Sequence, residues 1–299
     1  MQLDFAVEAI EAVEITGPKA IEGAALMSPY VWKHGARCCI LLRVVPPPGA
    51  TPTSTGAIWY GESDDGLHFH LTDAPVIAPG RDLDVGGCED PTLVQLEDRA
   101  LVYYTGVDAG GATGQLLVCE GPDVEHLVKT EIALASTQSQ GNTKEASIDC
   151  TLTDGWRLFY EYARNEASLV GLAIGPGPTG PWTEKPQPFA PRDKHWDSWH
   201  LSTGPLLTSH KDAPVMFYNG ATHDARWRIG WVAFDAEYRT VVDRCVEPLI
   251  APPPRPDRAA ADIAFAASLI SSPKSPQSIL YYSCGDAWLE RAHIRRFRH

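Results

Sequence analysis

The chain has 299 residues, of which 44% are hydrophobic, so it can bury a core of full globular size without disulfides or metals. Its 25 Lys and Arg residues are outnumbered by 38 Asp and Glu residues, and the formal net charge is -13. This charge argues against nucleic acid or an anionic membrane surface as the partner, and it suits a neutral ligand such as a sugar.

The opening segment carries no targeting signal that we recognise. It reads MQLDFAVEAIEAVEITG, with neither a basic start nor a long apolar run, so we expect no secretory signal, no membrane helix and a cytoplasmic protein. Its spacing is the best helix candidate in the chain, although it also fits a strand. The seven cysteines lack C-x-x-C spacing, and the ten histidines lack H-E-x-x-H, so we expect reduced thiols, no metal site and no cofactor.

An internal repeat organises the rest of the chain. Short runs rich in β-branched and aromatic residues recur, with starts separated by 62, 56, 58 and 64 residues. They are CILLRVV from Cys39, LVYYTGV from Leu101, RLFYEYA from Arg157, VMFYNGA from Val215 and ILYYSCG from Ile279. A period of this length is decisive for fold class, because each unit must bury its faces against its neighbours.

A second strand-like run follows each of these segments. The runs are AIWYGES, QLLVCEG, LVGLAIG, RIGWVAF and WLERAHI, and each unit therefore contains a strand, a turn and an antiparallel partner. Sheets of about four strands at a period near 60 residues are typical of propeller blades. The sequence predicts an all-β, five-bladed β-propeller forming a single domain over residues 1–299, with a β-sandwich of irregular hairpins as the alternative.

Propellers bind small ligands where strands converge on the axis, so we looked for chemistry in the loops between blades. Four expected loops carry carboxylates, and the last three combine them with aromatic or basic residues: GGCEDPT (86–92), TKEASID (143–149), KHWDSWHLSTGP (194–205) and YYSCGD (281–286). The first has adjacent carboxylates, Glu89 and Asp90, although an aspartate before a proline also fits a simple turn.

Aromatic rings and carboxylates together indicate a carbohydrate site. A pyranose offers apolar C–H faces for stacking and hydroxyl groups that carboxylates bind. Cleavage of a glycosidic bond further needs an acid at the leaving oxygen and a base or nucleophile at the anomeric carbon. Trp196, Asp197, Trp199 and His200 in the third loop are candidates for sugar contacts, with the tryptophans stacking on a sugar beyond the cleaved bond, or else bracing a blade.

These motifs resemble family 130 of the glycoside hydrolases, the β-mannoside phosphorylases and β-mannosidases. The resemblance follows SDDGLHF from Ser63, GCEDPTLVQLEDRALVYYTGVD from Gly87, WDSWHLSTGPLL from Trp196, FYNG from Phe217, RIGWVAFD from Arg228, EPLIAP from Glu247 and YYSCGD from Tyr281. It covers nearly the whole chain and implies the five-bladed fold with an oligosaccharide or glycoside as substrate.

The resemblance also implies roles for three residues. Asp90, the aspartate of the G-x-E-D-P motif, takes the role of proton donor. Arg43 in LLRVV and Asp286 after the last repeat match an arginine and an aspartate that line the sugar pocket, beside Glu89. For Arg43, a salt bridge at the edge of a blade is the alternative.

Departures from the family pattern bear on the nucleophile. Thr92 stands where the phosphorylases have an arginine, Asn219 replaces the histidine of their Y-H-G motif, and residues 161–163 read EYA where they read H-R-P. Lys144 and Arg164 are the remaining cations that could face a phosphate, which is too little charge to hold a dianion. We therefore expect water to replace phosphate.

An inverting hydrolase needs its two carboxyl groups roughly 6.5–9.5 Å apart to admit a water molecule. The candidates for the base are Glu161, expected on an inner strand, then Glu145 and Asp149. The alternatives are a phosphorylase with an altered phosphate site, a hydrolase of furanosides and a non-catalytic sugar-binding propeller. The oligomeric state is open, and a homo-oligomer is compatible with the sequence.

Overall fold

Strands make up almost all of the regular structure. The computed structural model describes residues 3–50, 53–80, 83–111, 113–137, 140–209, 213–253 and 262–298. Within these ranges the regular elements are strands and one turn of 3-10 helix, η1 (Lys19–Ile21), so the all-β prediction is confirmed. The opening segment forms a strand, β1 (Leu3–Thr16). No helix of the described residues is long and apolar enough to span a membrane.

The first half of the chain forms successive antiparallel groups of four strands, each pairing with the next in sequence. The first group is β2 (Ala25–His34), β3 (Arg37–Val45), β4 (Ala57–Ser63) and β5 (His68–Leu71). The second is β6 (Gly87–Gln95), β7 (Ala100–Val107), β8 (Gly114–Gly121) and β9 (Val128–Leu134). The third is β10 (Gly141–Asp149), β11 (Trp156–Arg164), β12 (Ala167–Gly175) and β13 (Thr183–Lys185).

The next part of the chain forms two short sheets and passes back and forth between them. One sheet contains β14 (His200–Ser202), β17 (Asn219–Ala221) and β18 (Trp227–Ile229). The other contains β15 (Leu206–Leu207), β16 (Val215–Met216), β19 (Val232–Phe234) and β20 (Val241–Arg244). Only short breaks in the chain separate β14 from β15 and β16 from β17, so each pair continues one strand from one sheet into the other. We therefore treat the two sheets as one interrupted group.

The last group closes the structure with the first strand of the chain. It contains β21 (Ala264–Ser271), β22 (Gln277–Cys284) and β23 (Trp288–Arg298), and β1 pairs with β23 from Leu3↔Arg298 to Val13↔Leu289. The far end of β1 pairs in parallel with β5, which joins the first and last groups into one sheet of eight strands. The two ends of the described chain therefore lie side by side.

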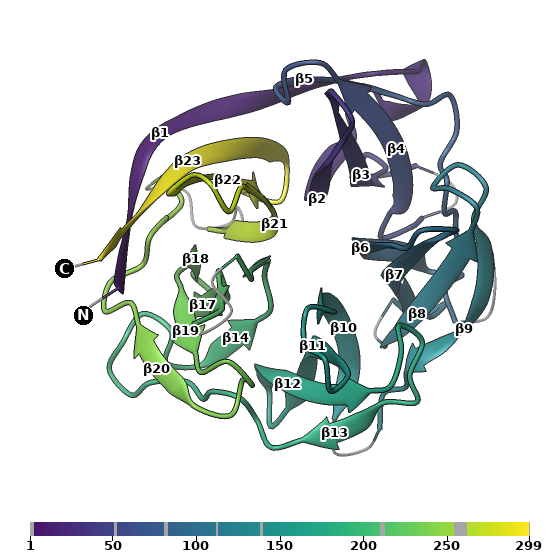
Figure 1. Cartoon of the computed structure of the whole chain (residues 1–299). Helices are drawn as coiled ribbons and strands as arrows, with labels where there is room; N and C mark the ends of the chain where they lie inside the picture. The colour runs from purple at the N-terminus through teal and green to yellow at the C-terminus, as the bar shows by residue number, and fades with distance from the viewer. Residues whose placement is uncertain are drawn as a thin grey trace.

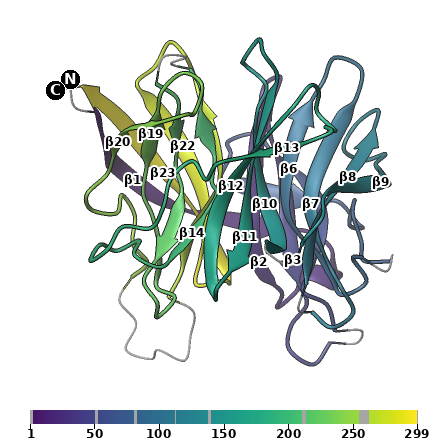
Figure 2. The same cartoon turned by 90° about the horizontal axis from the view of Figure 1, so that it is seen from below.

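The groups stand around a common centre, as Figure 1 shows, with β6, β10 and β21 near the centre and β9, β13 and β1 at the periphery. In the side view the strands run between the two faces of this ring (Figure 2). The runs that define the sequence repeat form β3, β7, β11, β16 with β17, and β22, so they are the second strands of the groups. The expectation that Glu161 lies on an inner strand is wrong, since it belongs to β11.

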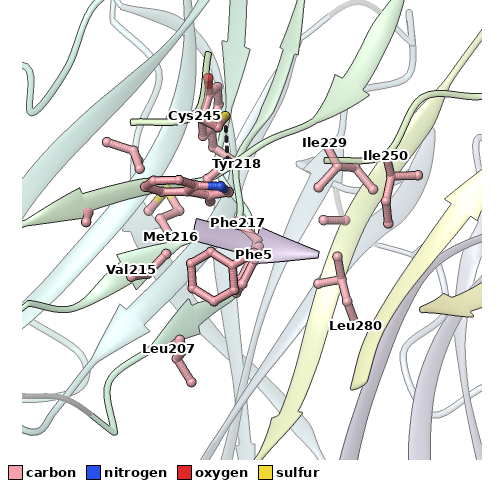
Figure 3. Packing of buried hydrophobic residues seen from close by; sticks show 14 of the residues in the cluster. Phe5, Leu207, Val215, Met216, Phe217, Tyr218, Ile229, Cys245, Ile250 and Leu280 are labelled. Atoms are coloured by element: carbon pink, nitrogen blue, oxygen red, sulfur yellow. Dashed lines mark hydrogen bonds between the residues drawn. The ribbon is translucent and has the colours of Figure 1, made fainter. Parts of the chain in front are cut away.

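Apolar side chains fill the spaces between neighbouring groups. The largest cluster of buried residues joins β1 to the fourth and fifth groups. In Figure 3, Phe5 of β1 lies against Phe217, and their ring centroids are 5.0 Å apart in an edge-to-face contact. Burial of each such side chain contributes roughly 1.5–3 kcal/mol, so these contacts hold the groups together.

Candidate active site

The first strands of four groups are interrupted by β-bulges close to their starts. The register shifts between Met27 and Tyr30 in β2, Glu89 and Thr92 in β6, Lys144 and Ser147 in β10, and Ala266 and Ser268 in β21. The backbone is left-handed at three bulge residues: Ser28 (φ 49°), Asp90 (φ 50°) and Glu145 (φ 56°). This conformation is strained for residues other than glycine, and such positions cluster at functional sites. The expectation that 86–92 and 143–149 are loops is wrong, because they lie largely within β6 and β10.

Asp90 is nearly buried, with 5% of its surface exposed. The Ser28 hydroxyl donates a hydrogen bond of 2.6 Å to its Oδ1, and Nη1 of Arg43 lies 3.6 Å from the same oxygen. Pro91 follows where the ladder is already broken, so its missing N–H costs no pairing. The bulge therefore presents the Asp90 carboxyl to one donor and one cation.

Arg43 of β3 joins the two adjacent carboxyl groups of β6. Its Nη2 lies 2.6 Å from Oε1 of Glu89, and its Nε donates to the Thr55 carbonyl over 2.9 Å. Burial raises the pKa of Glu89, and the guanidinium of Arg43 opposes this rise. Gly56 leaves room for the arginine, since a Cβ there would lie 2.9 Å from Cγ of Arg43.

Lys144 and Glu145 bring the third group into the same site. Nζ of Lys144 lies 3.5 Å from Oε1 of Glu161, and this carboxylate is the main reason that the pKa of Lys144 is raised. Burial holds the pKa of Glu145 well above its usual range, and the charge of Asp90 adds to the effect. The Glu145 and Asp90 carboxyl groups are in hydrogen-bonding contact, which favours the protonated form of Glu145.

Asp286 completes the site from the turn between β22 and β23, where its φ is 50°. Burial raises its pKa most strongly, Asp90 raises it further, and the cations Arg43 and Lys144 lower it. We call Arg43, Glu89, Asp90, Lys144, Glu145, Glu161 and Asp286 the acidic cluster. It unites seven of the residues predicted from sequence, drawn from the first, second, third and last groups.

The charge of the acidic cluster is unbalanced. Five carboxyl groups face two cations, and each cation already has a carboxylate partner. Like charges at this density favour retained protons, which agrees with the raised pKa values of Glu89, Glu145 and Asp286. Such a site offers proton donors, acceptors for hydroxyl groups and little attraction for an anion.

Asp149 does not join the cluster. It lies four residues beyond Glu145 along β10, roughly 13 Å away for an extended strand. Its Oδ2 accepts a hydrogen bond of 2.7 Å from the Tyr238 hydroxyl and its Oδ1 one of 2.7 Å from the Thr151 amide, and only 2% of its surface is exposed. These contacts tie β10 to the fourth group and leave the carboxylate far from Asp90.

Asp197 and Trp196 form part of the framework under the fourth group. Asp197 has no exposed surface and binds Arg192, Arg244 and the Tyr218 hydroxyl, which donates over 2.5 Å. The Trp196 ring stacks on Tyr218 with centroids 5.4 Å apart and packs against the largest core cluster. Neither side chain is brought to the acidic cluster.

Asn219 is also fully buried, and its amide is occupied by backbone groups. Nδ2 donates to the Thr203 carbonyl over 2.6 Å and to the Ala266 carbonyl over 3.2 Å, while Oδ1 accepts from the Ala266 amide over 2.7 Å. It therefore links the first strands of the fourth and fifth groups, and all its strong hydrogen-bonding positions face the backbone.

His200 lies at the edge of the acidic cluster, whereas Arg164 does not reach it. Nδ1 of His200 accepts a hydrogen bond of 3.1 Å from the Ser168 amide, and burial lowers its pKa against the opposing charge of Glu161. Arg164 is exposed at the end of β11, with its guanidinium 5.4 Å from the centroid of the Tyr162 ring.

Ser28 was missed by sequence reasoning, although a signal exists. Ser28 precedes Pro29 at the bulge of β2, as Asp90 precedes Pro91 at the bulge of β6. Aligning the first strands of the groups, rather than the second strands, would have placed Ser28 beside Asp90.

Comparisons with known proteins point in one direction. The sequence model of glycoside hydrolase family 130, described as beta-1,4-mannooligosaccharide phosphorylase, matches residues 50–258. A curated relative, the 1,2-beta-oligomannan phosphorylase of Thermoanaerobacter sp. (strain X514), is 21% identical over 202 residues, which span 64% of this chain and 63% of that protein.

Two solved structures share the fold. The beta-1,2-mannobiose phosphorylase of Listeria innocua, in complex with beta-1,2-mannobiose, aligns with a TM-score of 0.76 and 16% identity over 96% of this chain and 91% of its own. A second aligns with a TM-score of 0.72 and 19% identity over 96% and 94%. Its description states that the GH130 family of mannoside phosphorylases contains glycoside hydrolases that target beta-1,2 mannosidic linkages in Candida mannan.

Proposed function

The chain belongs to glycoside hydrolase family 130, and from this premise we propose that it cleaves β-mannosides or a related glycoside by attack of water, with Asp90 as proton donor. The observation that carries the proposal is the composition of the acidic cluster. Five carboxyl groups surround two cations that are already paired, which is an environment for a neutral sugar and a water molecule.

We favour water over phosphate as the nucleophile because the acidic cluster lacks unpaired positive charge. A phosphate dianion needs several unpaired cations, and the described residues of the cluster supply only Arg43 and Lys144. Thr92 donates its hydroxyl to the Ala146 carbonyl over 2.6 Å, and Asn219 is bound to backbone groups. The resemblance implies that the phosphorylases use these two positions to bind phosphate. In this chain the two side chains instead join neighbouring strands.

We assign the base to Glu161. It lies beside Lys144, the ion pair with Lys144 fixes its position, and its charge acts on Glu145 as that of Asp90 does. Water attacks the anomeric carbon and gives its proton to Glu161, while the glycosidic oxygen takes a proton from Asp90 as the bond breaks. Glu145, whose pKa is raised, holds a proton beside Asp90.

The remaining members of the acidic cluster hold the sugar. Arg43 donates to hydroxyl or ring oxygens, while Glu89 and Asp286 accept from hydroxyl groups. Since Arg43 contacts both Glu89 and Asp90, it also fixes the distance between the sugar and its proton donor. An oligosaccharide or glycoside is the substrate that this set fits.

We further interpret the ring of strand groups as the five blades of a single β-propeller domain. The support is the order of the strands: four groups begin with a bulged strand near the centre, and β1 closes the last group as its outer strand. The phosphorylase alternative has a specific argument in its favour, which is that the family model, the curated relative and the Listeria innocua structure all carry that name.

The test is release of reducing sugar from a panel of β-mannosides and furanosides, with and without phosphate. We expect turnover that phosphate does not change, and a loss of about a hundredfold or more in Asp90→Asn. Asparagine tolerates the left-handed backbone at this position, so the variant should fold. Asp64→Asn, with 94% of its side chain exposed, is the matched control. Turnover that requires phosphate would establish the phosphorylase instead.

A further inference from the structure

The bulge of β10 leaves two residues without partners in the strand ladder. The pairing with β11 shifts between Lys144 and Ser147, so Glu145 and Ala146 lie between the paired positions. Backbone carbonyls that leave a ladder away from water need hydrogen-bond donors from elsewhere. The donors that reach this bulge therefore decide how firmly Glu145 is held.

Two threonine hydroxyls supply these hydrogen bonds from two neighbouring groups. Thr203, directly after β14 in the fourth group, donates to the Glu145 carbonyl. Thr92 of β6, in the second group, donates to the Ala146 carbonyl over 2.6 Å. Both threonines are buried, and β10 belongs to the group that lies between theirs in the ring (Figure 1). We call Thr92 and Thr203 the threonine pair.

The Thr203 end of the pair is itself fixed by further hydrogen bonds. Nδ2 of Asn219 donates to the Thr203 carbonyl over 2.6 Å, and the Ser147 hydroxyl donates to the carbonyl of the next residue, Gly204, over 2.7 Å. The Asn219 amide is in turn bound to the Ala266 backbone of β21. Contacts with the third, fourth and fifth groups therefore set the position of the Thr203 hydroxyl.

Glu145 needs this support because its backbone is left-handed, with a φ of 56°. Such a conformation is strained for a residue with a side chain, and it persists only where the surroundings hold it. In this conformation the Glu145 carboxyl group is in hydrogen-bonding contact with Asp90. When a hydrogen bond to the bulge is lost, the backbone can relax, and the carboxyl group then moves away from Asp90.

We propose that Thr92 and Thr203 are positioning residues, which hold the Glu145 carboxyl group against Asp90 by binding the two unpaired carbonyls of the bulge. The inference rests on the proposed function, in which Asp90 donates a proton and Glu145 holds one beside it. It gives the fourth group a part in the acidic cluster, although no member of that cluster comes from it.

The test follows the titration of Glu145 by carboxyl-carbon NMR of isotope-labelled protein, with the signal identified by its loss in Glu145→Gln. Burial and the charge of Asp90 raise the pKa of Glu145, so a carboxyl group that moves away from Asp90 toward water titrates at lower pH. Thr203→Val and Thr92→Val nearly keep the shape of the side chain and remove the hydroxyl. We expect each to lower the midpoint of the Glu145 titration by about one pH unit or more.

Thr203→Ser and Thr92→Ser keep the hydroxyl and should retain the wild-type midpoint. The charged and titratable groups around Glu145 are the same in every threonine variant, namely Asp90, Lys144, Glu161, Arg43, Glu89, Asp286 and His200. A matched control is Thr130→Val, because the Thr130 hydroxyl donates to the Val118 carbonyl over 3.0 Å on the outer strand β9. This variant should leave the midpoint unchanged.

Each threonine is tested separately, and an unchanged midpoint in either valine variant would overturn the role of that threonine. Serine variants that shift as far as the valine variants would also overturn the inference, because the hydroxyl would then not be responsible. The titration needs no substrate. A wild type that cleaves no glycoside would contradict the proposed function and leave the titration result standing, so the two failures are distinguishable.

Discussion

Asp90 and Glu145 share an unusual backbone conformation, and this explains how two carboxyl groups from different strands come into contact. Each is the left-handed residue of a bulge, and Ser28 occupies the corresponding bulge of the first group. Ser28 donates a hydrogen bond to Asp90, and Glu145 is in hydrogen-bonding contact with the same carboxyl group. The strain at three bulges is thus offset by a hydrogen-bonded pair that can hold and release a proton.

The raised pKa of Glu145 predicts a specific dependence of stability on pH. The folded state binds the proton more tightly than the unfolded state, so this group's contribution is full below its usual pKa of about 4.3 and is lost as pH rises toward the folded value. Glu145→Gln has no proton to release. We therefore expect the Tm of the variant, relative to wild type, to rise between about pH 4 and pH 8.

Glu8→Gln provides a control of opposite sign in the same thermal scans. Hydrogen bonds from Arg295 and Gln277 lower the pKa of Glu8, so its contribution is present at neutral pH and is lost as pH falls. The charged groups that act on Glu145, namely Asp90, Lys144 and Glu161, and the other members of the acidic cluster, Arg43, Glu89 and Asp286, are common to wild type and variant. A Tm difference for Glu145→Gln that is flat or falls with pH would show that Glu145 is ionised in the folded protein.

At the scale of single elements, the second strands of the groups could be predicted and the first strands could not. Runs such as LVYYTGV are fully buried in β7, and their uniform apolar pattern survives in the sequence. The first strands mix glycine, proline and charged residues because they bulge toward a polar site, so GGCEDPT and TKEASID look like loops. Asp197 and Asn219 could not be assigned from sequence, since only the fold reveals that buried partners occupy them.

Gly204 lies in the break between β14 and β15, and its substitution tests how closely the chain is packed there. A Cβ at this position would lie 1.8 Å from the Phe217 carbonyl oxygen, and the Gly204 carbonyl accepts a hydrogen bond of 2.7 Å from Ser147. Gly204→Ala must therefore displace backbone that joins the third and fourth groups. We expect a loss of about 3 kcal/mol or more in the free energy of unfolding, measured by urea denaturation.

Gly177→Ala is the matched control, because its Cβ would meet no atom within 4 Å. It should change the free energy of unfolding by less than about 0.5 kcal/mol. Equal effects of the two substitutions would mean that the chain near Gly204 relaxes freely, and the close approach of the two strands would then have no structural importance.

At the scale of the whole molecule, β1 is the element that closes the ring. It pairs with β23 along most of its length and with β5 at its end, so the first and last groups depend on it together. The acidic cluster draws residues from the first, second, third and last groups. Its geometry therefore depends on a closed ring, which the sequence repeat predicts only in outline.

Substitution of Phe5 measures how much the closure by β1 contributes to the free energy of unfolding. Its ring is 6% exposed and lies 5.0 Å from Phe217 and 5.5 Å from Trp231, whereas Ile10 on the same strand is 51% exposed. Phe5→Ala should lower the free energy of unfolding by roughly 3–5 kcal/mol, and Ile10→Ala by less than about 0.5 kcal/mol. Because β1 holds both ends of the ring, tryptophan fluorescence and the proposed glycosidase activity should be lost in the same urea transition. Loss of activity at a lower urea concentration than loss of fluorescence would instead mean that the acidic cluster opens before the ring does.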